Sequence, residues 1–178
     1  MSAAPLDMLD RRDDAAVARY ERAFYQAFQR VVGNRLIRSL WLWDDDAGRL
    51  ATRIGYDQQV IYVQPGATTP LAAAVAVNVA MCSLQAGAFG FSVPEDANNP
   101  CEILTFFSVA EHNPAHRLAL LDQVFVDLRR RGHGDILATA GQRPMAVYRR
   151  YFSALGGEVA ASATLDGESR YFLRYRRP

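Results

Sequence analysis

The chain has 178 residues, of which 50% are hydrophobic and 22% charged, a composition that excludes a largely disordered chain. Its 20 Lys and Arg residues nearly balance 19 Asp and Glu residues, so the charge gives no indication of a nucleic-acid partner. The length fits one domain. We predict a single domain over residues 1–178, in which residues 1–13 form a flexible N-terminal tail.

The start of the chain lacks the pattern of an export signal, because Met1–Asp14 is polar and charged. The most apolar run, Leu71–Leu84, is too short to span a membrane and contains Asn78. We therefore expect a cytoplasmic protein without a membrane span. In that reducing compartment Cys82 and Cys101 are expected to be free thiols.

The N-terminal part predicts a helix followed by a β-hairpin. Apolar residues recur at helical spacing over Asp13–Val32. Strand-forming residues in Leu36–Trp43 and Arg49–Gly55 flank an acidic turn, which is typical of a hairpin. A further strand is predicted over Val60–Gln64, where it ends at a Pro-Gly pair.

The segment Leu71–Leu84 is ambiguous. Pro70 at a first helical position and Gly87 as a stop favour a helix, whereas valines that alternate with small residues favour a strand. We predict a helix there. The next segment, Ala88–Val93, is predicted to be a strand.

The C-terminal part alternates strands and helices before it ends in an antiparallel hairpin. The helix over Pro114–Arg131 has apolar residues along one face, and three arginines in its last turn suit the negative end of the helix dipole. The other predicted elements are a strand over Cys101–Val109, a strand over Asp135–Ala140, a helix over Pro144–Leu155, and a hairpin of Glu158–Thr164 with Arg170–Arg174.

This order and three segments within it resemble the GNAT-type acyltransferase superfamily. Cys101–Val109 is similar to the strand that contacts the donor, Leu120–Gly132 to the crossover helix, and Tyr148–Gly157 to the family's late "Y…LG" segment. The resemblance covers about the last 75 residues. It implies an α/β fold with a GNAT-like central mixed β-sheet flanked by helices, and a thioester donor such as acyl-CoA.

A narrower resemblance leads to the acyl-homoserine-lactone synthases and related N-acyl amino acid synthases. They have an N-terminal helix, a Tyr-Asp step and a following strand, to which Arg53–Asp57 and Val60–Val63 are similar. Glu102–Val109 resembles their "E…RF.V" strand, with Phe106 where Arg is usual. This branch implies acyl carrier protein as an alternative donor and partner.

The resemblance places the donor pyrophosphate at the start of the Pro114–Arg131 helix, because backbone N–H groups at a helix N-terminus bind anions. The implied contacts come from the strand end and the first helical turn: Val109, His112, Ala115, His116 and Arg117. The chain departs from the family at Arg117, where a small residue is expected. His116 and Arg117 could bind phosphate through their side chains or could be solvated first-turn residues.

Acyl transfer to an amine requires a base for the amine and an acid for the leaving thiolate. The predicted base is Glu102, with Glu111 and His112 as second choice; the alternative for Glu102 is a solvent-facing carboxylate. The candidates for the acid are Tyr148 and Tyr151, because Phe152 occupies the family's usual tyrosine position. Tyr151 is one residue from that position and points elsewhere on the helix, whereas Tyr148 lies one turn earlier on nearly the same face as Phe152, so the predicted acid is Tyr148. The alternative for Tyr148 is a buried tyrosine with a wet hydroxyl.

Together these features predict an N-acyltransferase that moves an acyl group from acyl-CoA or acyl carrier protein to an amine of a small molecule. A second interpretation is a non-catalytic protein of the same fold that binds a ligand or partner. A third is a homodimer module, which requires an exposed aromatic patch, for example at Trp41 and Trp43. No metal site is predicted, because the three histidines do not form a convincing zinc set.

Overall fold

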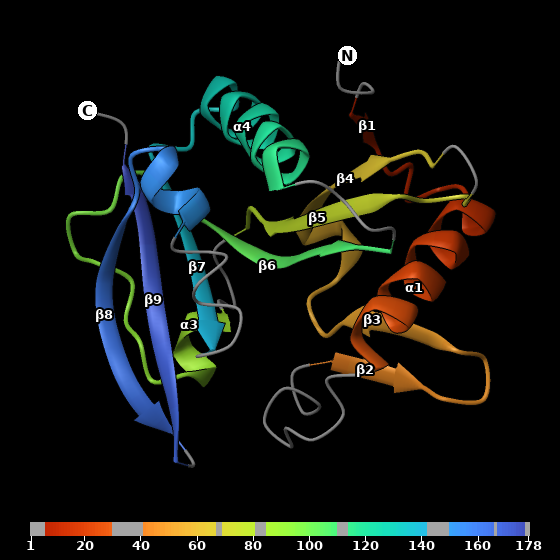
Figure 1. Cartoon of the computed structure of the whole chain (residues 1–178), viewed down its shortest axis with the longest axis horizontal. Coiled ribbons are helices and arrows are strands. Elements are labelled where there is room, and N and C mark those ends of the chain that lie inside the picture. The colour runs from red at the N-terminus through yellow and green to blue at the C-terminus, as the bar shows by residue number, and fades with distance from the viewer. Residues whose placement is uncertain are drawn as a thin grey trace.

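A seven-stranded mixed sheet crosses the molecule in the order β1-β4-β5-β6-β7-β9-β8, with a separate β2-β3 hairpin (Figure 1). The computed structural model describes residues 6–29, 41–66, 69–80, 85–109, 114–141, 150–165 and 167–176. The strands are β1 (Asp7–Met8), β2 (Trp41–Asp44), β3 (Arg49–Thr52), β4 (Gln59–Gln64), β5 (Ala73–Asn78), β6 (Cys101–Ser108), β7 (Asp135–Gly141), β8 (Glu158–Leu165) and β9 (Glu168–Arg176). The predicted mixed sheet is therefore confirmed.

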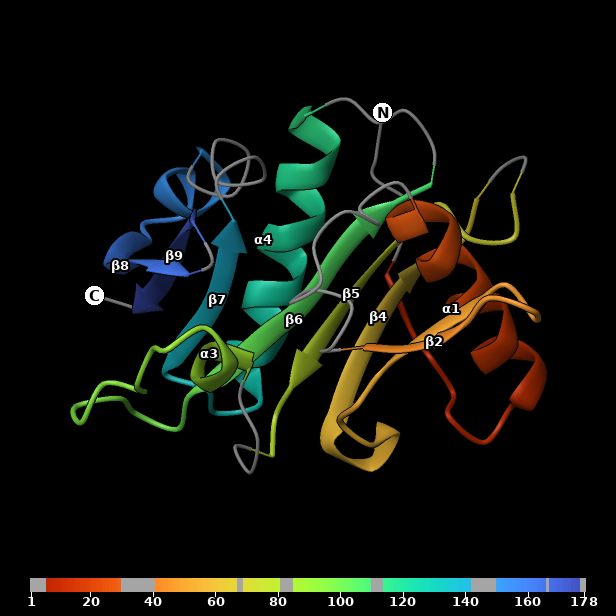
Figure 2. The same cartoon turned by 90° about the horizontal axis from the view of Figure 1, so that it is seen from below.

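Helices cover both faces of this sheet (Figures 1 and 2). Helix α4 (Pro114–Arg130) lies on one face, and α1 (Asp14–Phe28) and the short α3 (Gln85–Ala88) lie on the other. A 3-10 turn, η2 (Tyr56–Gln58), precedes β4, and residues 150–154 are helical. The molecule thus has three layers, with an apolar core on each side of the sheet.

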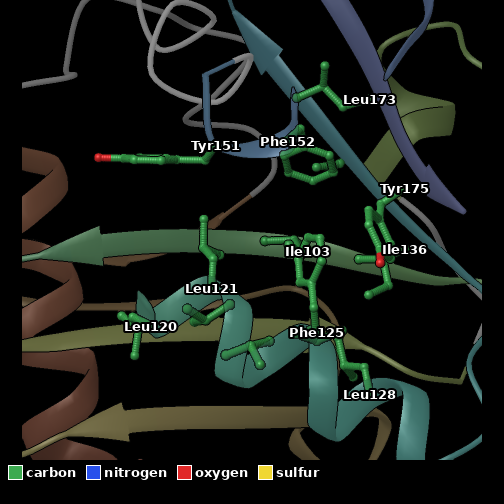
Figure 3. Packing of buried hydrophobic residues seen from close by; sticks show 14 of the residues in the cluster. Ile103, Leu120, Leu121, Phe125, Leu128, Ile136, Tyr151, Phe152, Leu173 and Tyr175 are labelled. Atoms are coloured by element: carbon green, nitrogen blue, oxygen red, sulfur yellow. The ribbon is translucent and has the colours of Figure 1, made fainter. Parts of the chain in front are cut away.

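The core between α4 and the sheet is the larger one (Figure 3). Leu121, Phe125 and Leu128 repeat at helical spacing along α4 and are fully buried against the strands. On the other face, Phe24 of α1 packs against Phe107 of β6, with ring centroids 5.2 Å apart. Trp41 is buried beside Phe24, so it does not form the exposed aromatic patch that the dimer interpretation requires.

Local sequence explains where the long helices begin and end. The Asp13 carboxylate accepts hydrogen bonds from the backbone N–H groups of Ala15 and Ala16, which caps α1. Helix α4 ends before Gly132, whose φ of 93° is a left-handed conformation that favours glycine. Helix α4 follows the sequence prediction closely, and the predicted hairpin is present as the shorter strands β2 and β3, with residues 36–40 of the prediction outside the described residues.

Three expectations differ from the structure. The segment predicted as a helix over 71–84 contains β5, so the alternation of valines with small residues was the correct signal. The strand is buried on both faces between β4 and β6, so it lacks the alternation of apolar and polar residues that marks a half-exposed strand. The strand predicted over Ala88–Val93 is absent: Phe89 and Phe91 pack on the sheet face without joining it. Within the predicted tail, residues 7–8 form β1 and pair with β4.

Candidate active site

Strands β6 and β7 are parallel neighbours only at their beginnings. Cys101, Glu102 and Ile103 pair with residues 136–138, whereas β6 continues to Ser108 and β7 to Gly141. We call the remaining part, Leu104–Ser108 of β6 with residues 139–141 of β7, the strand fork. The two strands diverge in both views (Figures 1 and 2). Ligands of open α/β sheets bind beyond the carboxyl ends of strands where such neighbours separate.

A β-bulge in β6 marks the base of the strand fork. On the β5 side, Ala76 pairs with Thr105 but Val77 pairs with Ile103, so Leu104 is the extra residue. Leu104 and Phe107 then share the core under α1, whereas Ile103 and Phe106 belong to the core under α4. The bulge therefore bends β6 away from β7, as bulges near functional sites commonly do.

Beyond the bulge, β6 has a strand neighbour on one side only among the residues that the structure describes. It remains paired with β5 up to Ser108, and the Val109 N–H donates to the Ala72 carbonyl at 3.0 Å. Val109, which is predicted to contact the acyl-donor substrate, thus lies at the open end of the strand fork. The opposite edge of this half of β6 can supply backbone hydrogen bonds to a bound molecule.

The predicted donor residues in the first turn of α4 lie in two environments. His116 Nε2 is 2.8 Å from Oε1 of the buried Gln64 of β4, so the His116 side chain is engaged with the sheet. Arg117 differs, because its Nε is buried and has no hydrogen-bond partner among the described residues. Ala115 stands between Pro114 and this pair. Arg117 is therefore the side chain of this turn with donor capacity left for an anion.

Glu102, the predicted base, lies on the paired part of β6, just before the bulge. It is fully buried, and its Oε1 accepts a hydrogen bond from the Ala86 backbone N–H at 2.7 Å. The expectation of a solvent-facing carboxylate is thereby wrong. The side chain faces α3 because the N–H of Ala86, at the start of that helix, is its donor.

Cys101 precedes Glu102 and faces the α4 core. Burial, reinforced by the charges of Glu102 and Asp135, raises the pKa of the Cys101 thiol to about 12. A thiol with such a pKa stays protonated near neutral pH and is a weak nucleophile. Cys101 is thus a packing residue beside the site.

The late helix contributes Tyr151, the candidate acid that the sequence places second to Tyr148. Its ring is buried and contacts Phe106 of the strand fork, with centroids 6.3 Å apart. Phe152 points the other way, into the core against Phe125 (Figure 3). Tyr148, His112 and Glu111 lie outside the described residues, so their predicted roles remain predictions.

The described residues also contain a surface hollow away from the strand fork. A hollow of about 710 Å³ lies at the opposite end of β7, where its lining includes Arg174 and Arg176, both of which pair with Asp135. None of the described helices is long and apolar enough to cross a membrane. Within the same residues, no group of three or more His, Cys, Asp and Glu is arranged to hold a metal ion.

Comparison by sequence finds no matching protein-family model and no matching curated protein. Comparison by structure finds TofI in a ternary complex with an inhibitor and MTA, with a TM-score of 0.72 and 15% identity over 97% of this chain and 90% of that one. MesI, a CoA-dependent acyl-homoserine lactone synthase, has a TM-score of 0.68 and 12% identity over 96% and 87% of the two chains. The ribosomal-protein-S18-alanine N-acetyltransferase of Escherichia coli has a TM-score of 0.59 and 15% identity over 97% and 92%.

These likenesses establish the fold: the chain has the GNAT fold, a mixed sheet with diverging central strands and the crossover helix α4. The resemblance inferred from about the last 75 residues is confirmed at that level. The structural likeness extends over nearly the whole chain, including the N-terminal part where the sequence resemblance was loose.

Proposed function

We propose that this protein is an N-acyltransferase that moves an acyl group from acyl-CoA, or from acyl carrier protein, to an amine of a small molecule. The observation that carries the proposal is the strand fork, with the buried carboxylate of Glu102 at its base and Arg117 at the start of α4. The donor thioester would lie along the edge of β6 that faces away from β5, with its phosphates toward Arg117.

In this proposal Glu102 takes a proton from the acceptor amine as the amine nitrogen attacks the thioester carbonyl. A C–N bond forms, the C–S bond breaks, and the thiolate that leaves takes a proton from a tyrosine. Tyr148 is the predicted acid, and Tyr151 is a second candidate because its ring reaches Phe106 in the strand fork. The proton balance is closed, since one proton leaves the amine and one reaches the thiolate.

The decisive experiment compares Glu102→Gln with the wild-type protein in an amine-dependent assay of CoA release. Removal of a general base lowers kcat by roughly 10²- to 10⁴-fold. Donor affinity, measured by the rise in melting temperature with acyl-CoA, should change little. Glu158→Gln, at an exposed position of β8, is the matched control. An unchanged kcat in Glu102→Gln would exclude this residue as the base.

A non-catalytic binding protein of the same fold is the second candidate function. Two observations favour it: Arg117 replaces a small residue in the donor turn, and Phe152 stands at the position where the family has tyrosine. A saturable rise in melting temperature with acyl-CoA, without release of CoA with any amine, would support this candidate against the enzyme.

A further inference from the structure

Arg170 of β9 is a buried cation that the proposed reaction does not use. Its side chain is 4% exposed and has an ion pair, at 2.7 Å, with Glu168, which is itself 53% exposed. Its Nε is buried and has no hydrogen-bond partner among the described residues. A guanidinium has five N–H donors in a fixed geometry, and here the Nε–H is a buried donor without a partner among the described residues, while one NH2 group pairs with Glu168. Such a group is costly to bury and requires an explanation.

The register places Arg170 at the open end of the strand fork. It lies directly opposite Gly141, the last residue of β7, in the antiparallel pair of β7 and β9. Residues opposite each other in such a pair point to the same face, and Gly141 has no side chain there. No β7 side chain therefore lies beside Arg170 at this position of the register. This position is on the side of Arg170 that leads to the strand fork.

Arg170 and Glu102 lie on the same face of the sheet. The Arg170 guanidinium carbon is 5.5 Å from the ring centroid of Phe89, and the Glu102 carboxylate binds the Ala86 N–H. Phe89 and Ala86 belong to one buried cluster under the sheet. A single short segment around α3 thus contacts both the buried carboxylate and the buried guanidinium.

We propose that Arg170 binds an anionic oxygen group, a carboxylate or a phosphate, on the amine acceptor. This inference rests on the proposed function, because Glu102 would receive the amine of the same molecule. Glu102 shares a row with Leu137 and Arg174, so Arg170 is four residues further along β9 and two strands across. At about 3.4 Å per residue and 4.8 Å per strand, the two Cα atoms are roughly 17 Å apart. The amine and the anionic group of the acceptor are therefore separated by several bonds.

The test measures amine-dependent CoA release with glycine, β-alanine, 4-aminobutyrate and 6-aminohexanoate, each beside its primary amide, and with 3-aminopropylphosphonate. The wild-type protein is expected to prefer one of the longer acids, or the phosphonate, over the neutral amide. The Arg170→Gln variant should lose roughly 100-fold in kcat/KM for the anionic acceptor and little for the amide. The better of the carboxylate and phosphonate substrates identifies the anionic group.

Two further variants separate recognition from a structural role. Glu168→Gln removes the ion-pair partner but keeps the guanidinium, so the preference for the anionic acceptor should persist; a purely structural pair would instead make both variants less stable with an unchanged preference. Arg22→Gln, at an exposed position of α1, is the control for the loss of one positive charge. Equal transfer to acids and amides by the wild-type protein would overturn the role of Arg170 and leave the acyltransferase function standing.

Absence of transfer to every amine would overturn the proposed function instead. The anion site is then decided by melting-temperature titrations with 6-aminohexanoate and 3-aminopropylphosphonate. A saturable rise in the wild-type protein that Arg170→Gln abolishes supports the site, and no rise with either compound overturns it.

Discussion

Tyr151 and Phe152 are adjacent in the sequence, yet one contacts the strand fork and the other fills the core. The prediction of Tyr148 as the acid depends on the helix face that carries Phe152 leading to the site. The burial of Phe152 against Phe125 shows that this face leads to α4. The ring contact of Tyr151 with Phe106 makes it the second candidate for the acid, beside Tyr148.

The two tyrosines can be distinguished by their phenylalanine variants. If Tyr151 is the acid, Tyr151→Phe should lower kcat by roughly 10²-fold, since a general acid contributes at least that much. Its donor affinity should stay unchanged, because the ring packing on Phe106 is retained. The same measurement on Tyr148→Phe is the comparison. A larger loss in Tyr148→Phe than in Tyr151→Phe would return the role to Tyr148.

The sequence correctly predicted Glu102 near the start of a strand but not its burial. A carboxylate at a strand start is ordinarily solvated, and here it is buried because β5, β7 and the N–H of Ala86 surround it. Ala86 is 16 residues from Glu102 in the chain, and Leu137, its partner in β7, is further away still. Local sequence therefore does not show that these residues enclose the carboxylate. The sequence left two interpretations open for Arg170 and the other basic residues near the C-terminus, solvated strand arginines or a phosphate site. Only the register with Gly141 places Arg170 at the strand fork.

At the scale of elements, the sequence predicts segments in which apolar residues repeat at a helical spacing. It does not predict a strand that is buried on both of its faces. Helix α4 buries one face of apolar residues, and their helical spacing in the sequence is sufficient to predict the helix. Strand β5 is covered on both faces, so it lacks an alternation of apolar and polar residues, and Pro70 suggested a helix start that the structure does not have. The strand fork itself depends on a bulge that has no sequence signature in Ile103–Thr105.

Helix α4 also gives a testable expectation for the donor. Arg117→Glu places a negative charge at the helix N-terminus, where it would repel the donor phosphates. We expect at least a 10-fold loss of acyl-CoA affinity with a melting temperature within about 2 °C of wild type, since Arg117 has no ion pair among the described residues. Affinity equal to wild type would remove the start of α4 as the donor site. Arg22→Glu on α1 controls for the change in net charge.

At the scale of the molecule, an ion-pair network joins the C-terminal strands to the loop before β6. The buried carboxylate of Asp135 binds Arg174 Nε at 2.6 Å and accepts from the Asn98 N–H at 2.7 Å. Burial acts to raise the pKa of Asp135, but hydrogen bonds from Arg174 and Asn98 outweigh it and hold the pKa below its usual range. Arg176 and Asp96 extend the network at the surface.

This network predicts how stability depends on pH. Because the folded pKa of Asp135 is depressed, its stabilisation is fully present above the unfolded pKa of about 3.9 and is lost as the pH falls through the folded value. Asp135→Asn should cost about 2 kcal/mol at pH 7, as an incompletely replaced buried ion pair. Denaturant unfolding at several pH values is the measurement. The gap between the two proteins should be constant from pH 5 to 8 and narrow below pH 4, and a gap independent of pH would contradict the assignment.

The three residue pairs between β6 and β7 are the only strand contact between two antiparallel sets among the described strands: β1-β4-β5-β6 and β7-β9-β8. In mechanical terms, tension applied across the sheet would act on this short parallel pairing, together with the packing of α4 and α3 and the Asp135 network described above. A molecule that hydrogen-bonds the β6 edge facing away from β5 while it contacts β7 would add a further connection between the two sets of strands. The force needed to separate the two halves is then itself a measure of occupancy.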